Sequence, residues 1–190
     1  DFDSSFNDKW EDNFENVLFN LKEIISSGKV RQIGISNENP WAFMKYLELS
    51  KKKLPKTITI QNPYSLLNRL FEIGNSEICM REDVGLLAYS PLGFGVLSGK
   101  YLNGNMPEDS RLKLFPNLSR FSGENSMKAT SMYYNISKKH DLSLTQMALS
   151  FVNSRPFVTS NIIGASKLNQ LKENIESINI DLSEDALKDI

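Results

Sequence analysis

The chain of 190 residues contains a single cysteine and a single histidine, and it has no long hydrophobic run. With only Cys79 it cannot form an internal disulfide, which favours a reducing compartment, so we expect a cytoplasmic protein. No apolar stretch approaches the roughly 18 residues of a membrane helix, and the polar opening DFDSSFNDKW is unlike a signal peptide. We therefore expect no membrane partner.

An excess of charge of one sign is also missing. The formal net charge is −1, so the chain has no overall basic field that would attract nucleic acid, and we expect no such partner. Hydrophobic residues make up 40% and charged residues 24%, as in soluble globular proteins, and 190 residues suffice for one domain with a core. We expect residues 1–190 to form a single domain. It opens at Asp1 and stops within DLSEDALKDI, where a helix is starting, so we expect a piece of a larger fold.

Helical patterns alternate along the chain with short apolar runs. Residues 11–27 place apolar side chains at helical spacing, and Asn39-Pro40 is typical of a helix start. The run TITI is rich in β-branched residues, and VGLLA is typical of a buried parallel strand. The predicted helices cover 11–27, 39–47, 69–82, 124–139, 143–154 and 168–177, and the predicted strands cover 30–35, 57–61, 84–89 and 158–163.

The stretch 91–123 breaks this rhythm. It contains five of the ten glycines and three of the seven prolines. A loop of this length inside a compact domain is usually functional or disordered.

The alternation predicts an α/β fold of about four βα units, which is half of a (β/α)8 TIM barrel. An open doubly wound sheet is the alternative. We favour the barrel because polar residues follow each predicted strand, and in a barrel the carboxyl ends of the strands form the active face. We expect Ser36, Gln61, Tyr89 and Ser166 to open onto one cleft at that face.

The first two strands end in hydroxyl and amide side chains. Ser36 and Asn37 follow one strand, and Gln61 and Asn62 follow the next. Such groups can recognise a carboxamide, which offers both a donor and an acceptor. The alternative is helix capping by Ser36 or Asn37 and a turn at Asn62 before Pro63.

Tyr89 ends the third strand and can stack on a flat ring. The glycines that follow allow the backbone to approach a phosphate, and Lys100 and Arg111 could neutralise its charge. The alternative is a glycine-rich surface loop with solvated charges.

The fourth strand is followed by Gly164-Ala165-Ser166-Lys167 and then a helix. Backbone N–H groups at a helix N-terminus bind anions, and Ser166 and Lys167 add a hydroxyl and a cation. Gln170, Glu173 and Asn174 continue at helical spacing. The alternative is an N-cap followed by an exposed polar face.

Taken together, these stretches resemble the aldo-keto reductases, most closely their Tas-like branch, from about Trp10 to the end of the chain. The matching segments are GKVRQIGISNENPW, TIQNPYSLLNR, LLAYSPLGFGVLSGKYLNG and IIGASKLNQLKENIES.

The resemblance implies that the cofactor is NADP(H) and that the partner is a small-molecule carbonyl substrate. It assigns the nicotinamide carboxamide to Ser36, Asn37 and Gln61, and the nicotinamide ring to Tyr89. It assigns the pyrophosphate to Ser90, Pro91, Leu92, Gly93 and Phe94, with Lys100 and Arg111 nearby. It assigns the adenosine phosphate to Ser166 and Lys167, beside Gly164, and the adenine end to Gln170, Glu173 and Asn174.

Catalysis in that family resembles acid-assisted hydride transfer to a carbonyl, with a Tyr, Lys, Asp and His in the first half of the barrel. None of the positions in this chain matches them. His140 follows a predicted helix and is expected to be structural, and Cys79 is expected to lie in the core. We assign no catalytic residue and no metal ligand, and expect residues 1–190 to be inactive alone. The alternatives are a non-catalytic NADP-binding sensor of the same fold and an unrelated barrel that binds a phosphorylated sugar.

Overall fold

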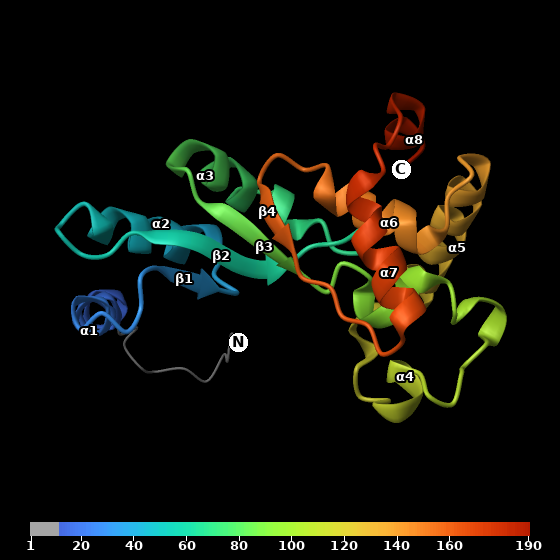
Figure 1. Cartoon of the computed structure of the whole chain (residues 1–190), viewed down its shortest axis with the longest axis horizontal. Coiled ribbons are helices and arrows are strands. Elements are labelled where there is room, and N and C mark those ends of the chain that lie inside the picture. Colours follow the sequence, from blue (N-terminus) through green and yellow to red (C-terminus); the bar gives the residue numbers. More distant parts are fainter. Residues whose placement is uncertain (1–11) are drawn as a thin grey trace, which may run out of the picture.

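The computed structural model describes residues 12–190 and contains a four-stranded parallel sheet in the order β1-β2-β3-β4 (Figure 1). The strands are β1 (Ile33–Ser36), β2 (Thr57–Pro63), β3 (Gly85–Tyr89) and β4 (Val158–Asn161). Each strand pairs in parallel with the next one along the chain. These observations confirm the predicted half-barrel of about four βα units: the described sheet has four strands, they are all parallel, and they alternate with helices.

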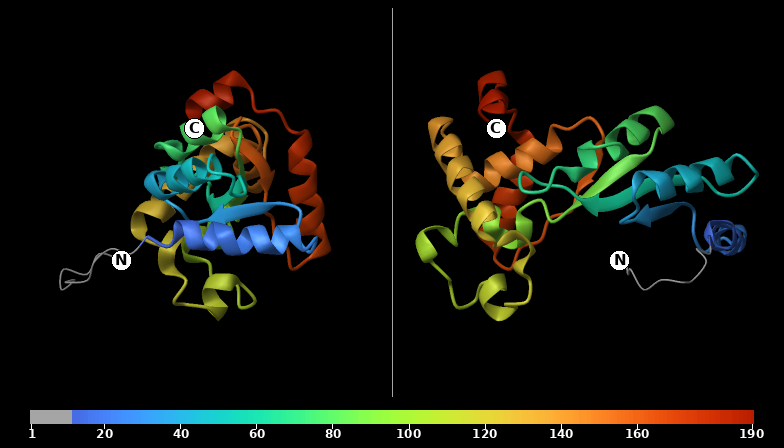
Figure 2. Two further views of the ribbon diagram at one scale, coloured as in Figure 1. Left: turned by 90° about the vertical axis from the view of Figure 1, so that its left-hand side faces the viewer. Right: turned by 180° about the vertical axis from the view of Figure 1, so that it is seen from behind.

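Helices connect the strands and flank the sheet. Figure 2 shows α1 beside the β1 end of the sheet and α7 beyond the β4 end. Asn39 accepts a hydrogen bond from the Ala42 N–H (3.0 Å) and Pro40 begins α2, as the Asn-Pro signature predicted. The α-helices of the described residues are α1 (Phe14–Ser26), α2 (Pro40–Ser50), α3 (Asn75–Glu82), α4 (Arg111–Leu114), α5 (Glu124–Lys139), α6 (Leu144–Asn153), α7 (Leu168–Glu176) and α8 (Glu184–Asp189).

The main core lies between the sheet and helices α2, α3 and α6. Phe43, Ile60, Tyr64 and Leu86 are fully buried there, and Phe151 of α6 packs against Tyr64. Burying one such side chain contributes roughly 1.5–3 kcal/mol. The core therefore holds the strand ends in a defined position. Cys79 also lies in this core, as predicted.

The stretch 91–123 is ordered by a small core of its own. Val96, Tyr101, Leu112 and Phe121 pack together and are buried. The segment contains α4 and the short 3-10 helices η2 (Gly93–Ser98), η3 (Leu102–Gly104) and η4 (Ser119–Phe121). The sequence left open whether this stretch is a functional loop or a disordered one. The structure is compatible with a functional loop and not with a disordered one.

The prediction of one continuous helix over 69–82 is wrong. The segment forms the 3-10 helix η1 (Leu70–Glu72) and then α3, with a break at Gly74. Gly74 has φ of +88°, outside the helical region, and a Cβ there would approach Pro40 to 3.1 Å. The helical pattern of the sequence conceals this break because Phe71 and Cys79, one on each side of it, are both buried.

Strand and helix boundaries shift by a few residues at other places. β1 begins at Ile33 because Val30 is exposed, β2 continues to Pro63 opposite Tyr89, and β4 ends at Asn161. The expected helix start at residue 11, the resemblance at Trp10 and the polar opening segment lie outside the described residues. Within residues 12–190, no helix is both long and apolar enough to span a membrane.

Candidate functional site

Three strand ends meet through a chain of hydrogen bonds. The Ser36 hydroxyl donates to the Gln61 carbonyl (2.9 Å), and the Asn37 Nδ2 donates to Ser36 Oγ (3.0 Å). The Tyr89 hydroxyl donates to Asn37 Oδ1 (2.7 Å), and the Asn37 N–H donates to Asn62 Oδ1 (2.8 Å). The parallel register explains this meeting, because Ser36 lies beside Gln61 and Tyr89 lies beside Pro63. This polar cluster can exchange partners with a ligand carboxamide.

The backbone at these strand ends is bent into the left-handed region. Asn37 follows β1 with φ of +60°, and Ser90 and Phe94 follow β3 with φ of +54° and +58°. Residues other than glycine rarely adopt this conformation, and such strain is concentrated at functional sites. The bends turn the chain at the carboxyl end of the sheet, where β3 leads into η2.

A cleft of about 730 Å³ opens beside these strand ends, a size suited to a small ligand or cofactor. One wall comes from the segment after β3 together with α4, a second from the turn between β4 and α7, and a third from the start of α6. The residues lining it are Ser90, Pro91, Leu92, Phe94, Gly95, Ser98, Lys100, Asp109, Arg111, Leu114, Phe115, Ser143, Thr145, Ile162, Ile163, Gly164, Ala165, Ser166, Gln170, Glu173 and Asn174.

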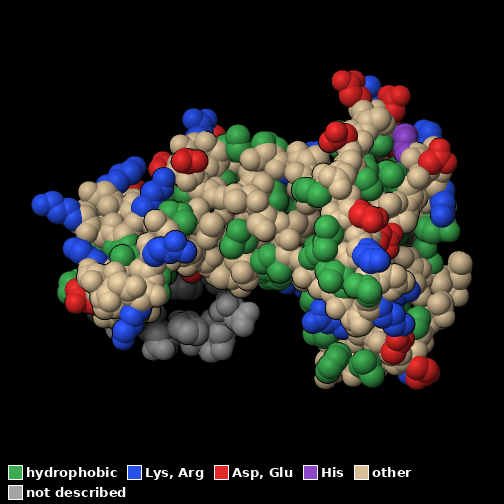
Figure 3. Space-filling model, viewed as in Figure 1, with side chains coloured by type: hydrophobic (Ala, Val, Ile, Leu, Met, Phe, Trp, Pro, Cys, Tyr) green, Lys and Arg blue, Asp and Glu red, His purple; other side chains and the backbone are tan. Residues whose placement is uncertain are grey.

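Cations are held at the cleft by aromatic rings and close packing. The Arg111 guanidinium lies 5.2 Å from the centre of the Phe94 ring, and Lys100 Nζ lies 5.3 Å from that of Tyr101. A Cβ added at Gly95 would lie 3.1 Å from Lys100 Nζ, so the absence of a side chain there leaves room for the lysine. Figure 3 shows basic side chains where α7 begins, above α4. The cleft can therefore accept phosphate groups.

The turn before α7 is organised by hydrogen bonds of Ser166 and by an ion pair of Lys167. The Ser166 N–H and hydroxyl both contact Gln170 Oε1, at 3.2 and 3.3 Å. Lys167 is the N-cap residue of α7, and its side chain makes no capping hydrogen bond. It forms an ion pair instead with Asp109 of the long segment (3.0 Å). Hydrogen bonding to Lys167 holds the pKa of the Asp109 carboxyl below its usual range. The pair joins two walls of the cleft.

Glu173 and Asn174 close the far end of the cleft. The Ser143 hydroxyl at the start of α6 donates to Glu173 Oε1 (2.6 Å), and Asn174 Nδ2 donates to the Gly164 carbonyl (3.5 Å). Asn174 is buried, whereas Glu173 is half-buried. This end presents acceptors in a cleft whose other charged lining residues are Lys100, Arg111 and Asp109.

The structure brings most of the predicted site residues into this one cleft, but not all of them. From the sequence we expected Ser36, Gln61, Tyr89 and Ser166 to open onto one cleft, and of these only Ser166 lines it. The other three, together with Asn37, lie at the strand ends outside the lining. Gln61 and Tyr89 nevertheless lie at the same end of the sheet. Gly93 is buried at the start of η2, and Lys167 lies outside the lining, paired with Asp109. The predicted residues that do line the cleft are Ser90, Pro91, Leu92, Phe94, Lys100, Arg111, Gly164, Ser166, Gln170, Glu173 and Asn174.

Several lining residues were missed by the sequence analysis. Ser143 carried a usable signal, because the pattern Ser-Leu-Thr-Gln is a capping box in which Ser143 Oγ and Gln146 satisfy each other's backbone. No local signal marks Asp109, whose role depends on a partner far along the chain.

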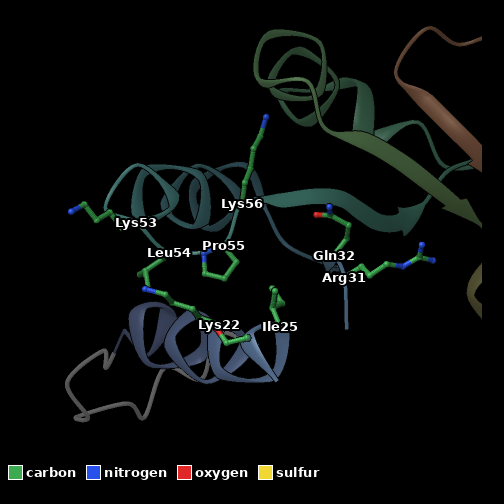
Figure 4. A pocket seen from close by; sticks show the side chains of 9 residues that line it. Lys22, Ile25, Arg31, Gln32, Lys53, Leu54, Pro55 and Lys56 are labelled. Carbon is green, nitrogen blue, oxygen red and sulfur yellow. The ribbon is translucent and has the colours of Figure 1, made fainter. Parts of the chain in front are cut away.

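His140 and a second hollow lie apart from this cleft. His140 follows α5, and its Nε2 lies 2.7 Å from Asp189 Oδ2 of α8, which agrees with the expected structural role. The second hollow, of about 390 Å³, lies between α1 and the segment before β2 (Figure 4). There Lys53, Lys56 and Arg31 point away from one another, so their charges do not converge on a single anion.

Comparison with known proteins agrees with this arrangement. A parallel half-barrel with a polar cleft at the carboxyl ends of its strands has its cleft where (β/α)8 barrels carry their active sites. The family model "Aldo/keto reductase family" matches residues 2–190. The chain therefore belongs to the aldo/keto reductase family.

Three relatives place it within that family. It is 52% identical over 171 residues to "Protein tas" of Escherichia coli (strain K12), covering 90% of this chain and 49% of that protein. It is 39% identical over 168 residues to an "Aldo-keto reductase" of Babesia bovis, covering 85% and 59%. It is 36% identical over 166 residues to "L-glyceraldehyde 3-phosphate reductase" of Escherichia coli (strain K12), covering 84% and 47%. The chain thus spans about half the length of these relatives, and the Tas-like branch agrees with the first of them.

Proposed function

We propose that this chain is the NADP(H)-binding part of an oxidoreductase that reduces aldehydes or ketones to alcohols. The observation that carries the proposal is the cleft that begins at Ser90, directly after the strand-end residue Tyr89, and extends along the bent backbone after β3 to the start of α7. Together, the strand ends and the cleft offer groups for a carboxamide, for phosphates and for a purine.

The nicotinamide end is assigned to the polar cluster at the strand ends. Ser36, Asn37 and Gln61 supply donors and acceptors for the carboxamide, and the half-buried Tyr89 ring supplies a stacking surface. The hydrogen bond from Tyr89 to Asn37 keeps both groups ordered before the ligand arrives. Less entropy is then lost on binding.

The phosphates are assigned to the middle of the cleft. Lys100 and Arg111 neutralise the pyrophosphate, and the backbone from Ser90 to Phe94 lies along it. Ser166, Lys167 and the N–H groups that begin α7 receive the 2′-phosphate. Gln170, Glu173 and Asn174 then face the adenine.

Bound NADPH would supply the hydride for carbonyl reduction. In this proposal the residues of the chain bind and orient the cofactor, and the proton donor lies outside residues 1–190. Residues 1–190 alone are then inactive. We also expect a cytoplasmic location, because the single cysteine is buried and unpaired.

The test is a binding and turnover experiment with the full-length protein. NADPH is titrated by fluorescence, and its oxidation is followed with a reactive aldehyde. We expect saturable binding that Gln61→Ala weakens, whereas Lys22→Ala, at the second hollow, leaves it unchanged. Absence of NADPH binding would overturn the proposal. Binding without turnover of any carbonyl would replace the enzyme with the sensor alternative.

A further inference from the structure

Glu173 is an anomaly within the cleft. Lys100 and Arg111 line the cleft together with two carboxylates, and of these Asp109 is paired with Lys167, whereas Glu173 at one end has no such partner among the described residues. Within the part of the chain that the structure describes, it forms no salt bridge. A carboxylate left unneutralised beside an anion-binding cleft repels phosphate, so it must serve a ligand group that donates hydrogen bonds.

The hydroxyl of Ser143 holds this carboxylate. Ser143 Oγ accepts a hydrogen bond from the Gln146 N–H (3.0 Å) within the capping box of α6. Because Ser143 Oγ already accepts from this N–H, its own proton is free to be donated to Glu173. The distance from Ser143 Oγ to Glu173 Oε1 is 2.6 Å. Glu173 Oε2 makes no hydrogen bond with the described residues. One carboxylate oxygen is thus fixed, and the other is left to accept.

The anchor itself is rigid. The residues of α6 from Leu144 to Val152 are buried except Gln146, and this helix packs into the main core. Ser143 is further restrained by the reciprocal bond from its own N–H to Gln146 Oε1 (2.9 Å). Ser143, which lies 30 residues before Glu173 in the sequence, therefore orients the Glu173 carboxylate from a rigid helix. Such preorganisation strengthens hydrogen bonding to a ligand.

We infer that Ser143 is a positioning residue that orients Glu173 to accept a hydrogen bond from the exocyclic amino group of a purine. The inference rests on the proposed function and deepens it. It makes the cleft selective for a 6-amino purine over a 6-oxo purine, whose carbonyl oxygen would face the carboxylate. One charge-assisted hydrogen bond corresponds to a preference of about tenfold.

The test compares two cofactors in the full-length protein. Kd values are measured for NADPH and for its hypoxanthine analogue, in which a 6-oxo group and an N1–H replace the 6-amino group and the unprotonated N1 of adenine. We expect the wild type to bind NADPH about tenfold more tightly. The readout is the ratio of the two values, because a general loss of structure weakens both cofactors alike.

Three variants separate positioning from capping. Ser143→Thr retains both the cap and the donor, so the ratio should stay at the wild-type value. Ser143→Asp retains an N-cap acceptor but cannot donate, and it repels Glu173, so the ratio should fall toward one while Tm stays close to that of the wild type. Glu173→Gln should abolish the preference directly.

The outcomes distinguish this inference from the function on which it rests. If the wild type binds neither cofactor, the proposed function fails and the inference fails with it. If NADPH binds well and Ser143→Asp leaves the ratio unchanged, the positioning role is wrong, whereas the proposed function stands. A wild-type ratio near one would likewise overturn the inference alone.

Discussion

At the scale of single residues, Tyr89 combines two roles that a substitution can separate. Its hydroxyl orders Asn37, and its ring lies where the nicotinamide is proposed to stack. Tyr89→Ala removes both contributions, whereas Tyr89→Phe removes only the hydrogen bond. We expect the alanine variant to weaken NADPH binding by about 1 kcal/mol, or about fivefold in Kd.

The phenylalanine variant is the control for this prediction. It should bind NADPH with at most a small loss, because the ring remains. Calorimetric titration of both variants of the full-length protein checks the difference. Unchanged affinity in Tyr89→Ala would remove the residue from the site.

Cys79 allows a second test at this scale. Burial raises the pKa of its thiol to about 12, and only the thiolate reacts readily. We expect no reaction with a disulfide reagent at about pH 8 in the folded protein and full reaction in denaturant. Because the pKa of Cys79 is higher in the folded than in the unfolded protein, the protonated thiol adds its full contribution to the free energy of unfolding below about pH 9. This contribution is lost as the pH rises toward 12.

Cys79→Ala provides the comparison for that pH dependence. Its free energy of unfolding should fall less steeply than that of the wild type between about pH 9 and pH 11. Rapid labelling of the native thiol would contradict the buried position.

At the scale of elements, the ion pair between Lys167 and Asp109 connects the turn before α7 with the long segment after β3. It also holds Lys167 away from a ligand phosphate. The lowered pKa of Asp109 means that this pairing is lost only as the pH falls below the usual carboxyl range. It therefore persists near neutral pH, and a bound 2′-phosphate must compete with Asp109.

Two substitutions in this pair should act in opposite directions. Lys167→Glu should lower the preference for NADPH over NADH by roughly tenfold, because it replaces a cation with an anion beside the 2′-phosphate. Asp109→Asn should maintain or raise that preference, because it frees Lys167. Kd values for both cofactors in the full-length protein check this. Equal affinity of the wild type for the two cofactors would refute the assignment.

At the scale of the whole molecule, the sheet has two open edges. β1 and β4 each pair with one neighbour among the described strands. A barrel avoids exposed edges by closing, and each uncovered large apolar side chain forgoes roughly 1.5–3 kcal/mol. Along α7 and the 3-10 helix η5 (Ser177–Asn179) runs an exposed apolar row at helical spacing: Leu168, Leu171, Ile175 and Ile178.

We therefore expect residues 1–190, produced alone, to self-associate or to remain loosely packed, and to reduce no carbonyl. Size-exclusion chromatography and an NADPH oxidation assay check the two parts of this expectation. Replacing Leu168 and Ile175 with lysine should reduce association if the α7 row contributes to it. A stable monomer that turns over an aldehyde at an ordinary enzymatic rate would contradict both parts.

The sequence by itself determined the order and kind of most elements. Strands and helices were identified because β-branched runs, helical apolar spacing and the Asn39-Pro40 start are local properties. The polar groups at the strand ends were also visible in the sequence, and the resemblance to the family supplied their expected roles. The break at Gly74 was missed because the apolar spacing on both sides of it is compatible with a continuous helix, whereas the positive φ of Gly74 is visible only in the folded chain.

The assembly of the site could be seen only in the folded chain. Asp109 reaches Lys167, and Ser143 reaches Glu173, across long stretches of sequence. It also placed Lys167 beside Asp109 rather than in the cleft lining, and it separated the strand-end cluster from the cleft. These arrangements depend on helix packing and on the small core within 91–123, because contacts between distant segments arise only when the whole chain is packed.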